Sequence, residues 1–92
     1  MTNDADVQLM HNIATLVEGV QSLAKRAQEA YLEWLRLDHR RLARASEDRP
    51  QSPYLEERVA EARAEYDELD RYYTEALTGN LAWIKAEFEK RS

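Results

Sequence analysis

The sequence predicts an all-α fold: an antiparallel hairpin of two long helices that pack like a coiled coil. Apolar residues recur at alternating steps of three and four in both halves of the chain, which is the periodicity of a packed helix. The 92 residues include only two glycines and two prolines, and both prolines lie in the segment EDRPQSP at 47–53. Hydrophobic residues make up 43% of the chain, the share of a folded protein. We therefore expect a single domain, residues 1–92.

The first helix is expected over about residues 4–46, with Asn3 or Asp4 as its N-cap. Its apolar seam is Leu9, Ile13, Leu16, Val20, Leu23, Ala27, Ala30, Trp34 and Leu37. A second apolar row follows this seam one position later, at Met10, Val17, Ala24 and Tyr31. The two rows form a stripe about three positions in seven wide, which one partner helix would leave partly bare.

The turn is expected at 47–52, because each proline disfavours helical geometry in the residue before it. Ser52 followed by Pro53 has the pattern of an N-cap with proline in the first turn, so the second helix is expected over about 53–78.

The seam of the second helix is Leu55, Val59, Ala62, Tyr66, Leu69 and Tyr73. Beyond Tyr73 two steps of four follow in succession and shift the phase, so that Ile84 and Phe88 continue the seam. Gly79 lies inside this shift. Either the helix continues with a local unwinding, or Gly79 ends it and a short third helix covers 80–90.

Folding the chain at Pro50 pairs residues whose numbers add to about one hundred. Two helices with wide apolar stripes cannot cover each other completely, and the common solution is a four-helix bundle or a foreign partner. We therefore expect a homodimer, or docking on another protein.

A basic cluster at the end of the first helix includes Arg36, Arg40, Arg41 and Arg44. Most of its charge is expected to face the acidic start of the second helix, around Glu56–Glu65, and so to fix the hairpin register. Arg41 and Arg44 continue the seam at positions that should be apolar, so these two and Arg40 are candidates for binding a partner. Three aromatic residues away from the main seam are candidate interface anchors: Tyr54, Tyr72 and Trp83.

Catalytic, metal-binding and cofactor-binding residues are not expected, and neither is enzymatic activity. The chain has no cysteine, and neither histidine completes a Glu-x-x-His motif or a catalytic triad. The carboxylates of Glu57, Glu61, Glu65 and Glu68 are similar to the glutamate-rich helices of all-α nucleotide pyrophosphohydrolases. That resemblance implies one distant alternative, a magnesium-dependent nucleotide hydrolase, although the second carboxylate pair of that family is missing.

A net charge of −5 disfavours direct binding to nucleic acid and favours a protein partner with a basic surface. No apolar run is long enough to span a membrane, and the acidic start MTNDAD differs from a secretory signal, so a cytoplasmic location is expected.

The hairpin length and Tyr66-x-x-x-Asp70 resemble the small helical proteins of type VII secretion, but Pro50–Pro53 replaces the Trp-x-Gly turn of that family. Size and charge are also similar to those of phage-encoded inhibitors. We expect a small inhibitor or regulatory adaptor that binds a larger protein; the alternative is a structural, assembly or secretion-related hairpin whose self-association is its function.

Overall fold

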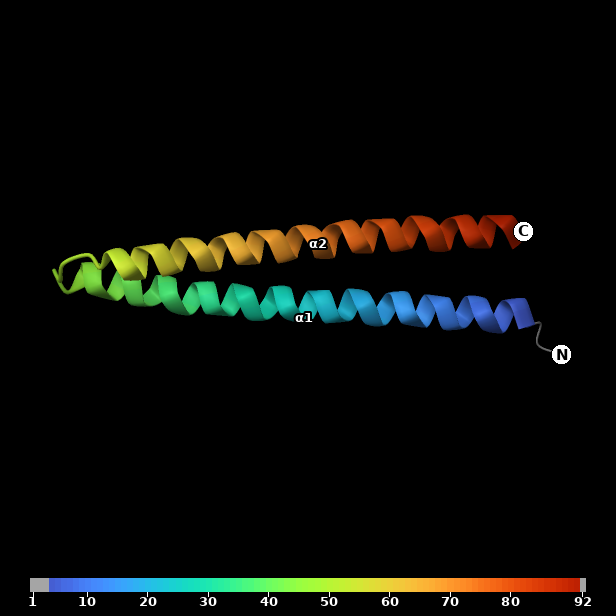
Figure 1. Ribbon diagram of the computed structural model, residues 1–92, viewed down its shortest axis with the longest axis horizontal. Helices are drawn as coiled ribbons and strands as arrows, with labels where there is room; N and C mark the ends of the chain where they lie inside the picture. Colours follow the sequence, from blue (N-terminus) through green and yellow to red (C-terminus); the bar gives the residue numbers. More distant parts are fainter. Residues whose placement is uncertain (1–3, 92) are drawn as a thin grey trace.

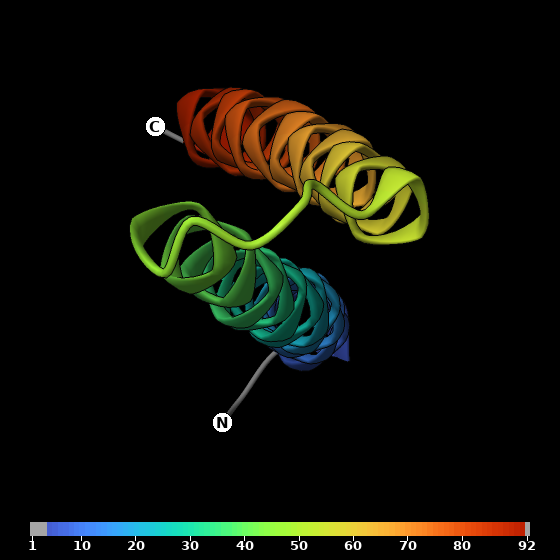
Figure 2. The same ribbon diagram turned by 90° about the vertical axis from the view of Figure 1, so that its left-hand side faces the viewer.

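The computed structural model describes residues 4–91 as two long helices joined by one short turn. Helix α1 is Asp4–Ser46 and helix α2 is Pro53–Arg91. They run antiparallel, with both termini at one end of a molecule measuring 71 × 19 × 17 Å (Figure 1). Viewed from the turn, the helix axes cross at a shallow angle (Figure 2). The predicted helical hairpin is confirmed; of the two expected N-caps, Asn3 lies outside the described residues.

The end of α1 is closed by a paired set of backbone hydrogen bonds. The Arg49 amide donates to the Arg44 carbonyl at 3.0 Å, and the Asp48 amide donates to the Ala45 carbonyl at 3.2 Å. Asp48 between them has a φ of 54°, in the left-handed region. This is the Schellman arrangement, in which glycine normally occupies the left-handed position, and aspartate is one of the few other residues that tolerates it.

The start of α2 is capped as the sequence predicts. The Ser52 hydroxyl accepts a hydrogen bond from the Leu55 amide at 3.3 Å, and the Ser52 carbonyl accepts one from the Glu56 amide at 2.9 Å. Pro53 follows in the first turn, where its missing N–H costs nothing. The cap fixes where α2 leaves the turn.

The best-buried side chains lie in two clusters in the turn half and the middle of the hairpin. One consists of Leu37, Leu55 and Ala62 with Trp34 and Val59, and the other of Ala27, Ala30 and Leu69 with Tyr66. In the half nearer the termini, the buried residue among those described is Leu9, which is 7% exposed. No described side chain has less than 2% of its surface exposed. The core is therefore a thin seam that weakens toward the termini.

Contacts across the seam agree with the expected register. Tyr31 lies beside Tyr66, and the Asn80 side chain donates to the Leu16 carbonyl at 3.4 Å. These pairs of residue numbers add to 97 and 96.

Helix α2 continues through Gly79 to Arg91, so a separate third helix is not formed. We also expected Phe88 to continue the seam after the shift in phase. This prediction is wrong, because Phe88 is 54% exposed. Asn80 and Glu87 instead lie half-buried on the side facing α1, while Leu81, one position later, is 59% exposed. The apolar pattern shifts by one position but the helix does not rotate with it, because each helix keeps the same side toward its neighbour along the whole hairpin.

Candidate interaction surfaces

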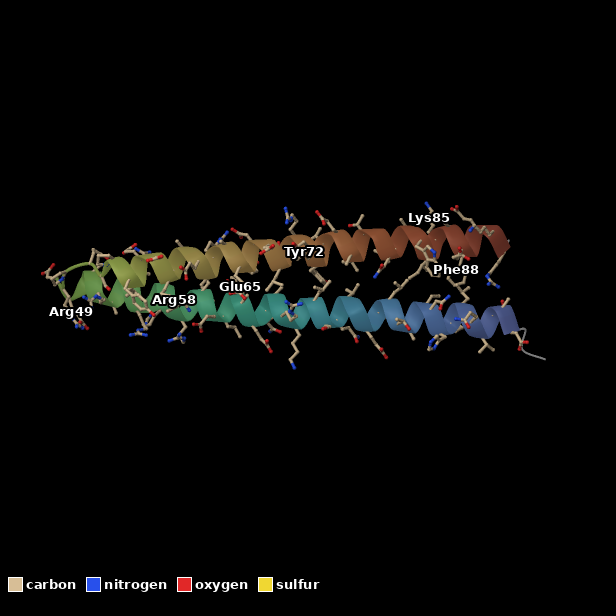
Figure 3. The ribbon with its side chains drawn as sticks, in the orientation of Figure 1. Arg49, Arg58, Glu65, Tyr72, Lys85 and Phe88 are labelled. Atoms are coloured by element: carbon tan, nitrogen blue, oxygen red, sulfur yellow. The ribbon has the colours of Figure 1, made fainter. Side chains whose placement is uncertain are left out.

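A cavity of about 510 Å³ lies at the turn end of the hairpin, between the last turns of α1 and the first turns of α2. Five arginines line it: Arg36, Arg40, Arg44, Arg49 and Arg58. Figure 3 shows Arg49 and Arg58 at this end of the molecule. We call this cavity the arginine pocket. Tyr54 and a single carboxylate, Glu47, also line it. Three of the six residues expected to bind a partner, Arg40, Arg44 and Tyr54, are therefore brought together here.

Arg44 also has a structural role at the turn. Its Nη2 donates to the Pro50 carbonyl at 2.8 Å, across the bend between the helices. Its Nε is buried and has no hydrogen-bond partner, which is costly for a charged group. Half-buried Arg44 thus anchors the turn and forms part of the pocket wall.

Arg41 does not line the arginine pocket. Its Nε and Nη2 both donate to Oδ1 of Asp38, at 3.0 and 2.8 Å. The hydrogen bonds that Arg41 donates to the Asp38 carboxylate raise the pKa of Arg41, and the negative charges of Asp38 and Glu56 add to the effect. A local carboxylate therefore neutralises the cation that interrupts the apolar seam.

The expected charge contact between the basic cluster and the acidic start of α2 is not formed as direct ion pairs. Arg36 instead binds Glu33, three residues earlier, at 2.6 Å, and this hydrogen bond lowers the pKa of Glu33. Residues three or four apart on one helix are closer neighbours than most pairs across the hairpin, so local pairs dominate. Within residues 4–91, the ion pair that joins the two helices connects Arg91 to Asp6 near the termini.

The other two expected anchors lie away from the arginine pocket. The Tyr72 hydroxyl donates to Glu68 at 3.0 Å, and the Arg71 guanidinium lies 5.2 Å from the centre of the Tyr72 ring. Tyr72 is near the middle of the molecule (Figure 3). Trp83 lines a separate hollow near the termini together with His11. Neither aromatic residue joins the other candidates in one site.

One side of the hairpin carries exposed apolar residues from both helices. Val17 and Leu81 line a hollow of about 170 Å³ between the helices, and Tyr31 lines another farther along. Residues seven positions apart lie on the same side of a helix, so Met10 and Phe88 extend this surface toward the termini. Val7 precedes Met10 by three positions, Leu35 follows Tyr31 by four, and Leu42 follows Leu35 by seven, so these three residues flank the same side of α1. We call this surface the docking face: Val7, Met10, Val17, Tyr31, Leu35, Leu42, Leu81 and Phe88, each at least 38% exposed.

An aromatic cluster marks the centre of the docking face. The ring centre of Tyr31 lies 5.1 Å from that of Tyr66 and 5.8 Å from that of Trp34. The guanidinium of Arg63 covers Trp34 at 4.5 Å from its ring centre. Tyrosine, tryptophan and arginine are the residue types that most often carry the binding energy of protein interfaces.

Sequence reasoning missed part of both surfaces. Phe88 was expected to continue the seam, and it lies on the docking face together with Leu81 instead. Arg36 was assigned to the charge contacts within the hairpin, although Arg36, Arg40 and Arg44 follow at steps of four, which places them along one side of α1. That spacing was the available signal for the pocket.

Residues 4–91 contain no group of three or more histidine, aspartate or glutamate side chains placed to hold a metal ion. No helix in the same range is long and apolar enough to cross a membrane.

Comparisons with known proteins give no relative. No protein-family model matches the sequence, and neither a curated protein nor a solved structure matches it.

Proposed function

We propose that the protein is a non-catalytic interaction module, a small inhibitor or regulatory adaptor that binds a larger protein through the docking face. The observation that carries this proposal is the exposure of large apolar side chains on one side of both helices: 64% for Met10, 59% for Leu81 and 54% for Phe88. Contiguous exposed apolar surface on a small protein commonly marks a site of protein association.

The thin core supports the same interpretation. A hairpin that buries no described side chain to below 2% exposure gains little from its own packing, and a partner that covers the docking face would add apolar burial. The aromatic cluster of Tyr31, Trp34 and Tyr66 supplies rigid side chains that need little ordering on binding.

The charges beside the docking face favour a partner with a basic rim. Asp70 lines the hollow next to Tyr31. Arg63, the cation at the centre of the face, is already paired with Asp67 at 3.2 Å. A second copy of the chain would bring the same carboxylates and the same paired arginine, whereas a partner with lysines or arginines around an apolar patch would supply opposite charge.

The proposal is tested by affinity capture from the native host with the wild-type protein and two double variants. Val17→Asp with Leu81→Asp places two carboxylates on the docking face. Thr15→Asp with Ala86→Asp adds the same charge on the side that carries Trp83. We expect the first variant to lose a partner that the wild type and the second variant retain, and we expect high salt to weaken that association.

Self-assembly is the alternative that the same variants distinguish. If the wild type sediments as a salt-insensitive dimer at micromolar concentration and Val17→Asp with Leu81→Asp sediments as a monomer, the docking face serves a second copy and the product is the oligomer. Equal retention of one partner by both variants would show that the docking face is not used.

A further inference from the structure

The arginine pocket has a composition that the docking proposal does not explain. Among its lining residues are five arginines and one carboxylate, Glu47. A guanidinium presents five N–H donors in a planar fork that matches the oxygens of phosphate groups. The cavity of about 510 Å³ lies within the usual range of small-molecule sites, roughly 300–1,000 Å³, and is larger than a single phosphate requires.

The pocket cations are only partly neutralised by the protein. Arg40 makes no ion pair with any residue in the range 4–91. Arg58 gives one nitrogen, Nη1, to Glu61 at 2.9 Å, and its other donors remain. The contact of Arg49 with Glu47 is long, at 3.4 Å, and both side chains are more than half exposed. Ion pairs between exposed side chains contribute little free energy, so an incoming anion can compete with the carboxylates for these arginines.

The turn end of the hairpin is less acidic than the rest of the chain. By the register of the hairpin, residues 36–61 share this end, and they contain six basic and six acidic residues, whereas the rest of the chain contains seven basic and twelve acidic residues. The molecule is 71 Å long and the Debye length is about 8 Å at physiological salt, so most of the distant acidic residues are screened from the pocket.

We propose that the arginine pocket binds an inorganic or organic oligophosphate, with Arg40 and Arg58 contacting its oxygens. Several linked phosphates fit the composition better than a single carboxylate, because they place multiple negative charges within the length of one cavity. This site is separate from the docking face and does not depend on it.

The test is isothermal titration calorimetry of the full chain with sodium tripolyphosphate at low salt. We expect saturable binding with one site per chain. Arg40→Gln and Arg58→Gln should each weaken the affinity by at least about tenfold, the loss of one charged hydrogen bond. Arg44 is left unchanged, because its bond to Pro50 holds the turn.

The matched control is Arg26→Gln, the same charge change on the exposed surface of α1 outside the pocket. We expect it to change the affinity by less than about twofold, because its charge is screened at that distance. No saturable binding up to millimolar tripolyphosphate would overturn the proposal, as would an equal loss in Arg26→Gln. Citrate binding as tightly as tripolyphosphate would overturn the assignment to phosphate.

Discussion

Leu37 is the most deeply buried residue of the hairpin, and shortening it tests whether the seam near the turn holds the two helices together. Its exposed fraction is 4%, and it packs in a cluster with Leu55 and Ala62. Leu→Ala in a protein core costs about 2–5 kcal/mol, from lost apolar burial and the cavity that remains. Because no described neighbour is buried to below 2% exposure, the site can partly collapse, so we expect Leu37→Ala to cost about 2–3 kcal/mol.

Urea denaturation at low protein concentration, followed by the helical circular dichroism signal, measures this cost. Leu42→Ala is the control, because it removes the same atoms from the same helix at a residue that is 52% exposed. We expect the control to change the free energy of unfolding by less than about 0.5 kcal/mol. Equal losses in the two variants, or a loss below about 1 kcal/mol for Leu37→Ala, would refute the packing described for this seam.

Three further changes test the turn, the far end of the seam and the surface ion pairs. Asp48→Gly should stabilise the hairpin by about 0.5–1 kcal/mol in the same urea assay, because glycine adopts the left-handed conformation without steric cost. Asn80→Leu should raise the urea midpoint, since it replaces a long hydrogen bond to Leu16 with apolar contact at a half-buried seam position; a lower midpoint would show that the polar contact stabilises the pair. The hydrogen bond from Arg36 lowers the pKa of Glu33 below its ordinary value of 4.5, so the pair should stabilise the fold above pH 4.5 and lose this effect as the pH falls through the lowered pKa. The difference in free energy of unfolding between the wild type and Glu33→Gln should therefore shrink in acid. A difference that does not change with pH would contradict the pairing.

The parts of the fold that depend on local signals could be predicted from the sequence. Pro50, Ser52 and Pro53 specify the turn and the start of α2 through their own backbone chemistry, and the apolar periodicity of α1 requires no knowledge of its partner. The exposure of Met10 and Tyr31 also follows from the width of the apolar stripe. Each of these features is determined within a few turns of helix.

The parts that depend on the relative rotation of the two helices could not be predicted in the same way. After Tyr73 the apolar residues move one position around α2. The helix could rotate and keep these residues in the seam, or keep its orientation and expose them on the surface, and the sequence alone does not distinguish the two. The helix keeps its orientation, so Leu81 and Phe88 become surface residues. The arginine pocket likewise depends on bringing Arg58 of α2 beside Arg40 of α1, which only the assembled hairpin shows.

Photo-crosslinking in the native host tests most directly whether the docking face binds a different protein. A photoreactive phenylalanine analogue replaces Leu81 on the docking face. As a control it replaces Ala86, an exposed residue three positions after Trp83 and therefore on the same side of α2 as Trp83. We predict that position 81 crosslinks to one larger protein and that position 86 does not. Crosslinks from position 81 only to a second copy of the chain, or to the same protein equally from both positions, would contradict the proposed function.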